Sequence, residues 1–449
     1  MDANTGARVI FSHTIPWQQT SLPAFLRRAA GQPRFFWESE RAAVSFAAFG
    51  AAAVISASGP DRYRQIETQA GEIFARAMVT RGDQVPPEAA RPRFVGGFPF
   101  LPDLPPNPAC HAEVWSCFEQ AFFALPRYLL SHWQGRCYLT VNAAAGSDDP
   151  WAAQEALWDL PAPLDIPLLD FSPTSVAPKD FTDRAGWDAA VCEAVARVRD
   201  GRLGKVVLAR AREFPAGANP VASLSRLSAR YPGCFRFLFE PEPGHAFFGA
   251  TPELLVSKRG RSVETMALAG SIRRGRSLAE DVHLAEQLSA SAKDRDEHDL
   301  VVRSVQERML PVLDRMEVLD RDLLRLSNIQ HLCTPIRGET REDAGLMDII
   351  DRLHPTPAVG GLPVRDALEF IASAEPVSRG WYAGPVGWFD GEGDGEFAVA
   401  LRSAVSDGVR TRLYAGAGIV AGSDPDREWR EIELKFQPMM EALGCIPGG

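Results

Sequence analysis

Two pairs of carboxylates are spaced so that they could bind one metal ion together. Asp294 and Glu297 lie in one predicted helix, and Glu428 and Glu431 repeat the same spacing in another helix near the C-terminus. Because residues three positions apart share a helix face, each pair presents its two acids in one direction. If the two faces met, their oxygens would form a site suited to Mg²⁺.

The competing interpretation of these acids is ordinary surface charge. Lys293 and Glu297, and likewise Glu431 and Lys435, are four residues apart and could form helical ion pairs in solvent. None of the 8 histidines occurs in an H-x-H or H-x-x-x-H pattern, so the sequence offers no comparable site for a softer metal. The acid pairs predict a magnesium site only if other residues that could bind a ligand or transfer protons lie beside them.

Two other groups could transfer protons. Lys205 begins the predicted strand GKVVLARARE, in which Val207 and Ala209 share its face. Burial among such neighbours favours the uncharged amine, which can act as a base, whereas an exposed lysine at a strand start would be merely structural. Glu253 follows a Thr-Pro turn in FFGATPELLV.

Small residues accompany two candidate binding groups. Arg402 falls on the same predicted strand face as Ala398 and Ala400, which would leave room for an anion beside the guanidinium. The alternative is a surface arginine on a half-exposed sheet. Ala269, Gly270 and Ser271 form a second patch of small residues.

The composition excludes several classes of function. A net charge of −10 over 449 residues argues against a nucleic-acid or anionic-membrane partner. The 7 cysteines are odd in number and contain no C-x-x-C pair, which disfavours a disulfide framework or a zinc knuckle. The N-terminal residues lack a signal pattern, and the most apolar stretch, Ala42 to Ala57, is too short to span a bilayer. We therefore expect a cytoplasmic enzyme with reduced thiols and no membrane partner.

Short strands and amphipathic helices must position these groups. Apolar patterns bounded by turn residues predict strands at 35–37, 44–55, 94–98, 137–142, 385–389, 396–405 and 411–420. Helical spacing predicts helices at 62–80, 183–200 and 277–300, and a last helix that begins at Ser423 or Asp424 with Pro425 in its first turn. Short turns among the C-terminal strands favour an antiparallel meander. The Pro-rich stretch 143–180 is either a domain linker or a long surface loop, and we favour the loop.

The motifs in the second half of the chain resemble those of the chorismate-binding enzymes, and most closely the isochorismate synthases. The motifs, in the family's order, are GKVVLAR, FGATPELLV, MALAGS, SAKDRDEH, LHPTPAVGGLP, YAGPVGW, FAVALRSA and LYAGAGIVAGSDPDREWREIELK. The resemblance implies an α+β fold in which two large antiparallel sheets pack together with helices outside. It also implies a single domain over 1–449, with a variable half at 1–180 and a motif-bearing half at 181–440.

The resemblance further implies roles for individual residues. Glu297 and Glu431 would bind Mg²⁺, which holds the ring carboxylate of chorismate, while Asp294 and Glu428 would hold water beside the ion. The family often has a glutamate at the position of Asp294, and the shorter side chain suits that outer position. The groups that would bind the substrate carboxylates are Arg402, Lys435, Gly416 and the backbone around Gly270 and Ser271. The pocket would be completed by Tyr414 and Leu401, with His354 near the ring and the metal.

The members of the family differ in the nucleophile that adds to the ring while the C4 hydroxyl of chorismate leaves. Glu253 would protonate the leaving group, and Lys205 would activate water. Aminodeoxychorismate synthases carry a nucleophilic lysine where this chain has Ala269, and anthranilate synthases lack a lysine at the Lys205 position. We therefore expect water addition at C2, giving isochorismate, and no glutaminase subunit. A salicylate synthase or another pyruvate-eliminating enzyme is the alternative, although HPTPAVGG resembles the isochorismate enzymes more.

Overall fold

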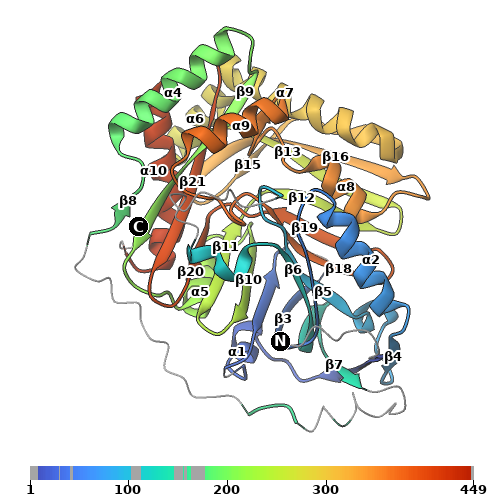
Figure 1. Ribbon diagram of the computed structural model, residues 1–449. Helices are drawn as coiled ribbons and strands as arrows, with labels where there is room; N and C mark the ends of the chain where they lie inside the picture. The colour runs from blue at the N-terminus through green and yellow to red at the C-terminus, as the bar shows by residue number, and fades with distance from the viewer. Residues whose placement is uncertain are drawn as a thin grey trace.

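The computed structural model describes residues 9–29, 31–40, 44–102, 113–145, 155, 159–162 and 177–445. Its strands form two arms that meet at β6 (Ala121–Trp133), as Figure 1 shows. One edge of β6 pairs with β3 (Ser45–Ala57). The other edge is divided between β5 (Arg93–Gly97) and β7 (Arg136–Ala145), so the hydrogen-bonded network branches at this strand.

Antiparallel pairing continues along both arms. From β3 the first arm runs through β2 (Arg34–Glu38), β10 (Phe235–Glu242), β11 (His245–Thr251), β20 (Ser403–Ser406), β21 (Thr411–Ile419) and β9 (Lys205–Phe214). From β5 the second arm runs through β18 (Pro385–Asp390), β19 (Gly395–Val399), β12 (Leu254–Arg259), β13 (Ser262–Arg273) and β16 (Ile329–Thr340). The shorter strands are β1 (Val9–Trp17), β4 (Met78–Arg81), β8 (Lys179–Asp180), β14 (Leu313–Val318), β15 (Asp322–Arg325) and β17 (Gly361–Leu362). The two expected antiparallel sheets correspond to these arms.

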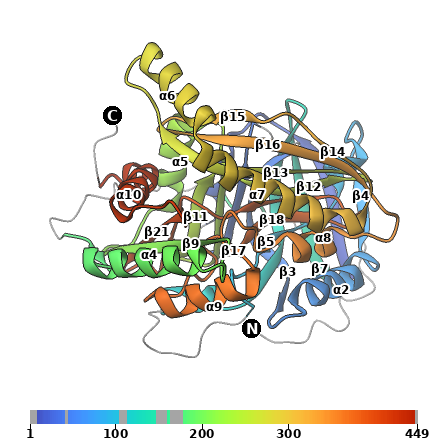
Figure 2. The same cartoon turned by 90° about the horizontal axis from the view of Figure 1, so that it is seen from above.

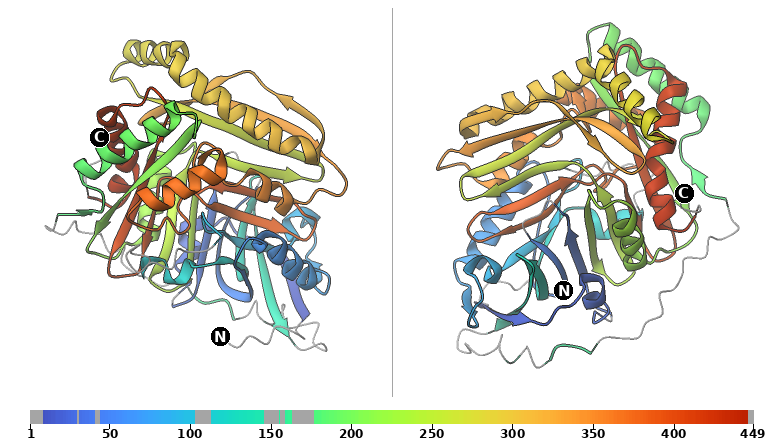
Figure 3. Two further views of the ribbon diagram at one scale, coloured as in Figure 1. Left: turned by 45° about the horizontal axis from the view of Figure 1, so that its top comes forward. Right: turned by 180° about the vertical axis from the view of Figure 1, so that it is seen from behind.

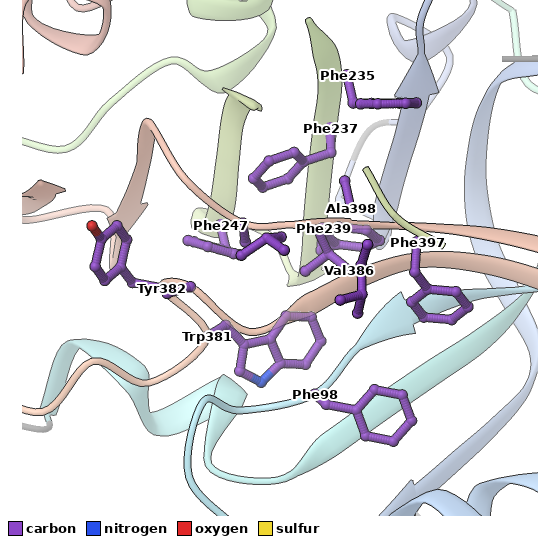
Figure 4. Packing of buried hydrophobic residues seen from close by; sticks show 14 of the residues in the cluster. Phe98, Phe235, Phe237, Phe239, Phe247, Trp381, Tyr382, Val386, Phe397 and Ala398 are labelled. Atoms are coloured by element: carbon purple, nitrogen blue, oxygen red, sulfur yellow. The ribbon is translucent and has the colours of Figure 1, made fainter. Parts of the chain in front are cut away.

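Aromatic side chains fill the space between the arms. Figure 4 shows Phe237 and Phe247 from the first arm beside Trp381, which precedes β18. The ring centroids of Phe247 and Trp381 lie 6.2 Å apart. One buried hydrogen bond also crosses between the arms, from the Trp37 indole nitrogen to Glu396 at 2.9 Å. Strands of the variable N-terminal half thus pack and pair with strands of the motif-bearing half, while the single-domain assignment itself stays a prediction.

Helices cover the outside of both arms. In the views of Figures 2 and 3, α6 (Leu278–Ala290) and α7 (Ala292–Met309) lie over β13 and β16. Along β9 and β21 lie α4 (Arg184–Arg199), α9 (Val364–Ala374) and α10 (Pro425–Ala442). The other α-helices are α1 (Leu22–Leu26), α2 (Arg62–Phe74), α5 (Pro220–Arg230) and α8 (Leu346–Leu353). None of the helices in the described part of the chain combines the length and the apolar character that a membrane span requires.

Three expected elements differ in the structure. The helix predicted at 62–80 ends at Phe74, and Met78–Arg81 is instead the exposed strand β4, which pairs in parallel with β1. The helix predicted at 277–300 is divided, because Ser291 adopts an extended conformation and its hydroxyl caps α7 by accepting from the Asp294 amide. The strand predicted at 396–405 breaks before Arg402, whose φ is 46°. The last helix starts after Asp424, as predicted.

Two other expectations concern the cysteines and the long connection. None of the six described cysteines is in a disulfide: Cys117, Cys137, Cys192, Cys234, Cys333 and Cys445. Cys110 and most of the connection at 143–180 lie outside the described residues. The choice between a linker and a surface loop therefore stays a prediction.

Candidate active site

A cavity of about 100 Å³ brings together groups from β9, β13, β21, α7 and α10. Both acid pairs and both proposed proton-transfer groups line it, although they come from distant parts of the sequence. The predicted site residues along its wall are Lys205, Glu253, Gly270, Ser271, Asp294, Glu297, Leu401, Arg402, Tyr414, Gly416, Glu428, Glu431 and Lys435. Ala269, the position that separates water-adding from lysine-bearing members, also lines this cavity.

Lys205 is buried in this cavity and is not an exposed strand-end lysine, since only 1% of it is accessible. Its ammonium lies 2.8 Å from the Glu297 carboxylate. Gly418 of β21 makes room for this contact, because a Cβ there would lie 2.7 Å from the Glu297 Oε1 and 2.9 Å from the Lys205 Cε. A β-strand lysine and a helical acid therefore meet against a position that lacks a side chain.

Glu253 is 3% exposed and sits in the short turn between β11 and β12. Its carbonyl accepts a hydrogen bond from the Val399 amide at 3.0 Å, which fixes the turn against β19. Burial raises the pKa of the Glu253 carboxyl to about 7, although the positive charges of Lys205 and Lys435 oppose the shift. The group can therefore hold a proton at neutral pH, as a general acid must.

The acids of α10 are paired with lysines. Lys435 lies 2.8 Å from Glu431, as predicted, and Ser271 donates a hydrogen bond to the same carboxylate at 2.9 Å. Lys293 does not pair with Glu297, and its ammonium instead lies 3.0 Å from Glu428. The reason is that α7 and α10 face each other across the cavity, so a contact between helices replaces one within a helix.

These contacts shift the pKa values of the two α10 acids in opposite directions. Burial, together with the nearby Glu431 charge, raises the pKa of Glu428. Burial also acts to raise the pKa of Glu431, but the contacts with Lys435 and Ser271 outweigh it and the pKa is lowered. Asp294 is held by the Ser291 hydroxyl and lies 3.6 Å from the Arg427 guanidinium.

The donor set fits a hard divalent cation. In the described part of the chain, no three His, Cys, Asp or Glu side chains are grouped closely enough to enclose an ion by themselves. Mg²⁺, however, usually takes only one or two carboxylates and completes its shell with water and substrate oxygens. Glu297 and Glu431 are two such carboxylates on the wall of one cavity, with Asp294 and Glu428 beside them.

Tyrosine rings form an apolar side of the cavity. The Tyr414 hydroxyl donates to the Ser378 carbonyl at 2.9 Å and accepts from the Trp115 indole at 2.9 Å, so it is engaged within the protein. Its ring stacks on Tyr382 with centroids 5.1 Å apart, and both rings line the cavity. Tyr414 therefore lines the cavity with its hydroxyl already engaged, while its role toward a ligand stays a prediction. On the same strand β21, the Gly416 carbonyl accepts a hydrogen bond from Lys435 at 2.8 Å.

His354 is the predicted site residue that is absent from the cavity wall. Its ring packs edge-on against Phe100 and shares a hydrogen bond with the Phe100 carbonyl at 3.0 Å. Burial lowers the pKa of His354 to about 3, so the ring is neutral. The histidine that does line the cavity is His331, on β16, and its ring meets the Arg402 guanidinium at 3.0 Å. Three cavity residues were not predicted as such: His331, Lys293 and Tyr382. Lys293 lies within SAKDRDEH and Tyr382 opens YAGPVGW, whereas His331 lies in none of the motifs.

Comparison with known proteins places this constellation in a family. The profile described as chorismate binding enzyme matches residues 2–444. This chain belongs to the chorismate-binding enzyme family. The salicylate biosynthesis isochorismate synthase of Pseudomonas aeruginosa is 39% identical over 427 residues, which cover 93% of this chain and 86% of that protein. The isochorismate synthase MenF of Bacillus subtilis is 34% identical over 92% of this chain and 88% of its own length.

Solved structures of relatives agree with this chorismate-binding fold. MenF from Escherichia coli, a menaquinone-specific isochorismate synthase, superimposes with a TM-score of 0.81 at 28% identity, over 98% of this chain and 96% of that chain. Anthranilate synthase component I from Streptococcus pneumoniae superimposes with a TM-score of 0.70 at 21% identity, over 90% of this chain and 93% of that chain. The second likeness concerns the fold alone.

Proposed function

We propose that this protein is a magnesium-dependent isochorismate synthase, which adds water at C2 of chorismate while the C4 hydroxyl leaves. The observation that carries the proposal is that Lys205 and Glu253, a buried amine and a buried acid, line one cavity together with the two acid pairs. The names of the relatives support the same reaction, since those in Pseudomonas aeruginosa and Bacillus subtilis are isochorismate synthases.

Glu253 is the proposed general acid. With a pKa of about 7 it carries a proton in much of the population at neutral pH and can donate it to the departing hydroxyl oxygen. Lys205 is the proposed base, which would accept a proton from the attacking water. The Glu297 carboxylate at 2.8 Å fixes the position of its nitrogen.

The remaining proposed roles concern binding. Glu297 and Glu431 would hold Mg²⁺, with Asp294 and Glu428 in the outer positions. Magnesium, when bound, would supply a fixed positive charge for a substrate carboxylate. The cavity groups proposed to hold the substrate carboxylates are Arg402, Lys435, Gly416, Gly270 and Ser271, beside the apolar Leu401 and Tyr414.

Water is the proposed nucleophile because the cavity wall has Ala269 where a covalent amine route would need a lysine. We accordingly propose that no glutaminase subunit is required. The test is to incubate the protein with chorismate and Mg²⁺ and to resolve the products by chromatography. We expect isochorismate without added ammonia. Salicylate with stoichiometric pyruvate as the main products would replace this proposal with a pyruvate-eliminating activity.

A further inference from the structure

His331 links the patch at Gly270 to the Arg402 guanidinium. On β16 it lies opposite Ser271 of β13, beside a bulge where the register shifts between Ala269 and Ser271. Gly270 is the extra residue of that bulge and has a φ of 75°, which glycine adopts readily. The His331 ring meets the Arg402 Nη2 at 3.0 Å, and the Gly270 backbone lies beside the ring.

The two contacts define the state of the ring. The guanidinium can only donate, so the His331 Nε2 must accept from it. The neighbouring Gly270 carbonyl requires the other ring nitrogen to carry the proton. Burial, with the positive charges of Arg402 and Lys435, lowers the pKa of His331 well below its usual value, so the ring stays neutral. A neutral histidine that is protonated on one defined nitrogen is a rigid spacer between a backbone carbonyl and an arginine.

Arg402 sits where the chain crosses from one arm to the other. β19 pairs within the second arm and β20 within the first, and the segment between them carries Arg402 with a φ of 46°. This region of backbone conformation is unfavourable for a residue with a side chain and is typically retained where function requires it. The Ala250 amide holds the backbone by donating to the Arg402 carbonyl at 3.1 Å.

The guanidinium keeps one donor available. Its Nη2 meets His331, and the Cys234 thiol also lies against the group. The Nη1, in contrast, is buried and has no hydrogen-bond partner within the residues that the structure describes. Buried donors are normally satisfied, so an unpartnered one on a cavity wall marks a place where a ligand accepts a hydrogen bond.

We propose that His331 is a positioning residue for substrate binding, which fixes the Arg402 guanidinium so that its Nη1 faces a substrate carboxylate. The inference rests on the proposed function, because chorismate supplies that carboxylate. His331 itself touches no reacting atom in this scheme. Loss of its acceptor would leave the Arg402 Nη2 buried without a partner, and the guanidinium would have to find another orientation before it could bind an anion.

The effect should therefore appear in substrate binding more than in the chemical step. A hydrogen bond to a charged group is worth enough to change a binding constant by about tenfold or more. We expect His331→Leu to weaken chorismate binding by about that factor and to raise KM, with a smaller change in kcat. An interaction made equally in the ground state and the transition state gives this pattern.

The variants separate positioning from stability. His331→Gln can place a carbonyl oxygen near the position of the ring Nε2, whereas His331→Asn is too short to reach it. Chorismate affinity should therefore be retained by the glutamine variant and lost by the asparagine variant. Gln330→Leu is the matched control, because Gln330 is the adjacent fully buried polar residue of β16 and does not line the cavity. It should lower the unfolding temperature and leave chorismate affinity unchanged.

A double-mutant cycle completes the test. Chorismate binding to the whole protein is measured by titration calorimetry for His331→Leu, Arg402→Gln and the double variant. We expect the histidine substitution to have no further effect once Arg402 is gone. The positioning role would be overturned if His331→Leu weakened chorismate binding as much in the Arg402→Gln background as in wild type. Equal chorismate affinities of His331→Gln and His331→Asn would also overturn it. Failure of the wild-type protein to bind or convert chorismate would instead count against the proposed function.

Discussion

Glu253→Gln should remove a pH-dependent cost of folding, because burial raises the pKa of the wild-type carboxyl from 4.5 to about 7. The folded protein then holds this proton more tightly than the unfolded chain does. Stability contributed by the acid form is complete below pH 4.5 and is lost as the pH rises to about 7. At about 1.4 kcal/mol per tenfold difference in proton affinity, the loss is about 3 kcal/mol.

The measurement is the free energy of unfolding of wild type and Glu253→Gln, obtained from urea titrations without metal at several values between about pH 5 and about pH 8. All other titrating groups are shared, so their contributions cancel in the difference between the two proteins. We expect the variant to gain about 2.5 kcal/mol relative to wild type across this range, because part of the total is already lost at pH 5. The gain arises because the amide cannot ionise.

The same substitution tests the catalytic role. Turnover should fall by about 10²–10⁴-fold, as expected for loss of a general acid. In the wild-type protein, forward turnover should decline as the pH rises through about 7, because the acid form is lost. A stability difference that stays constant with pH would refute the argument that Glu253 is protonated by burial. Near-normal turnover of the variant would refute its role as the acid.

Three further predictions concern the groups around the acid. Lys205→Ala should lower turnover by about 10²–10⁴-fold while chorismate still binds, and near-normal water addition would leave the lysine only a structural role. Gly418→Ala places a methyl group 2.7 Å from the Glu297 carboxylate, so turnover should fall. Gly422→Ala is the control and should be neutral, because nothing lies within 4 Å of its new methyl group. Equal activities of the two variants would show that the Lys205–Glu297 ion pair does not depend on the space at Gly418. Glu297→Ala and Glu431→Ala should each abolish Mg²⁺-dependent activity and the Mg²⁺ binding measured by calorimetry. The circular dichroism spectrum should be retained. Wild-type activity of both variants at limiting Mg²⁺ would show that the two acids do not bind the metal.

Helical spacing predicted the common face of each acid pair, because it depends on local geometry alone, whereas the roles of the other site residues were inferred from the family resemblance. Both acid pairs line the cavity, and each pair keeps its common face in α7 or α10. The start of α10 was also predictable, since Asp424 accepts a hydrogen bond from the Arg427 amide and Pro425 suits the first turn. Such capping chemistry is encoded within a few neighbouring residues.

The partners of the acids could not be predicted in the same way. The i, i+4 spacing predicts an ion pair between Lys293 and Glu297. In the structure Lys293 pairs with Glu428, and Glu297 pairs with Lys205. These choices depend on how α7, α10 and β9 meet, which is a property of the packed fold. An ammonium group that can reach two acids pairs with the one that packing brings nearer, and the sequence pattern does not contain that distance.

The break at Arg402 has a similar cause. The alternation of Ala398, Ala400 and Arg402 reads as one continuous strand. The chain instead leaves β19 at Val399 and enters β20 at Ser403, because the two segments pair with different arms. His331 was missed for the related reason that a single histidine in a strand pattern carries no sign of what lies opposite it.

Charge balance in the cavity explains why Arg402 matters to an anionic substrate. Of the cations on the wall that the structure describes, Arg402 is the one without a carboxylate partner. The paired groups are Lys205 with Glu297, Lys293 with Glu428, Lys435 with Glu431 and Arg379 with Glu375. One guanidinium can offset one carboxylate of the ligand, and a second carboxylate in a buried site requires another cation. The lysines on the wall already pair with acids, so a metal ion held between α7 and α10 would supply that further cation. The same arrangement therefore connects the proposed magnesium site to the binding of a substrate with two carboxylates.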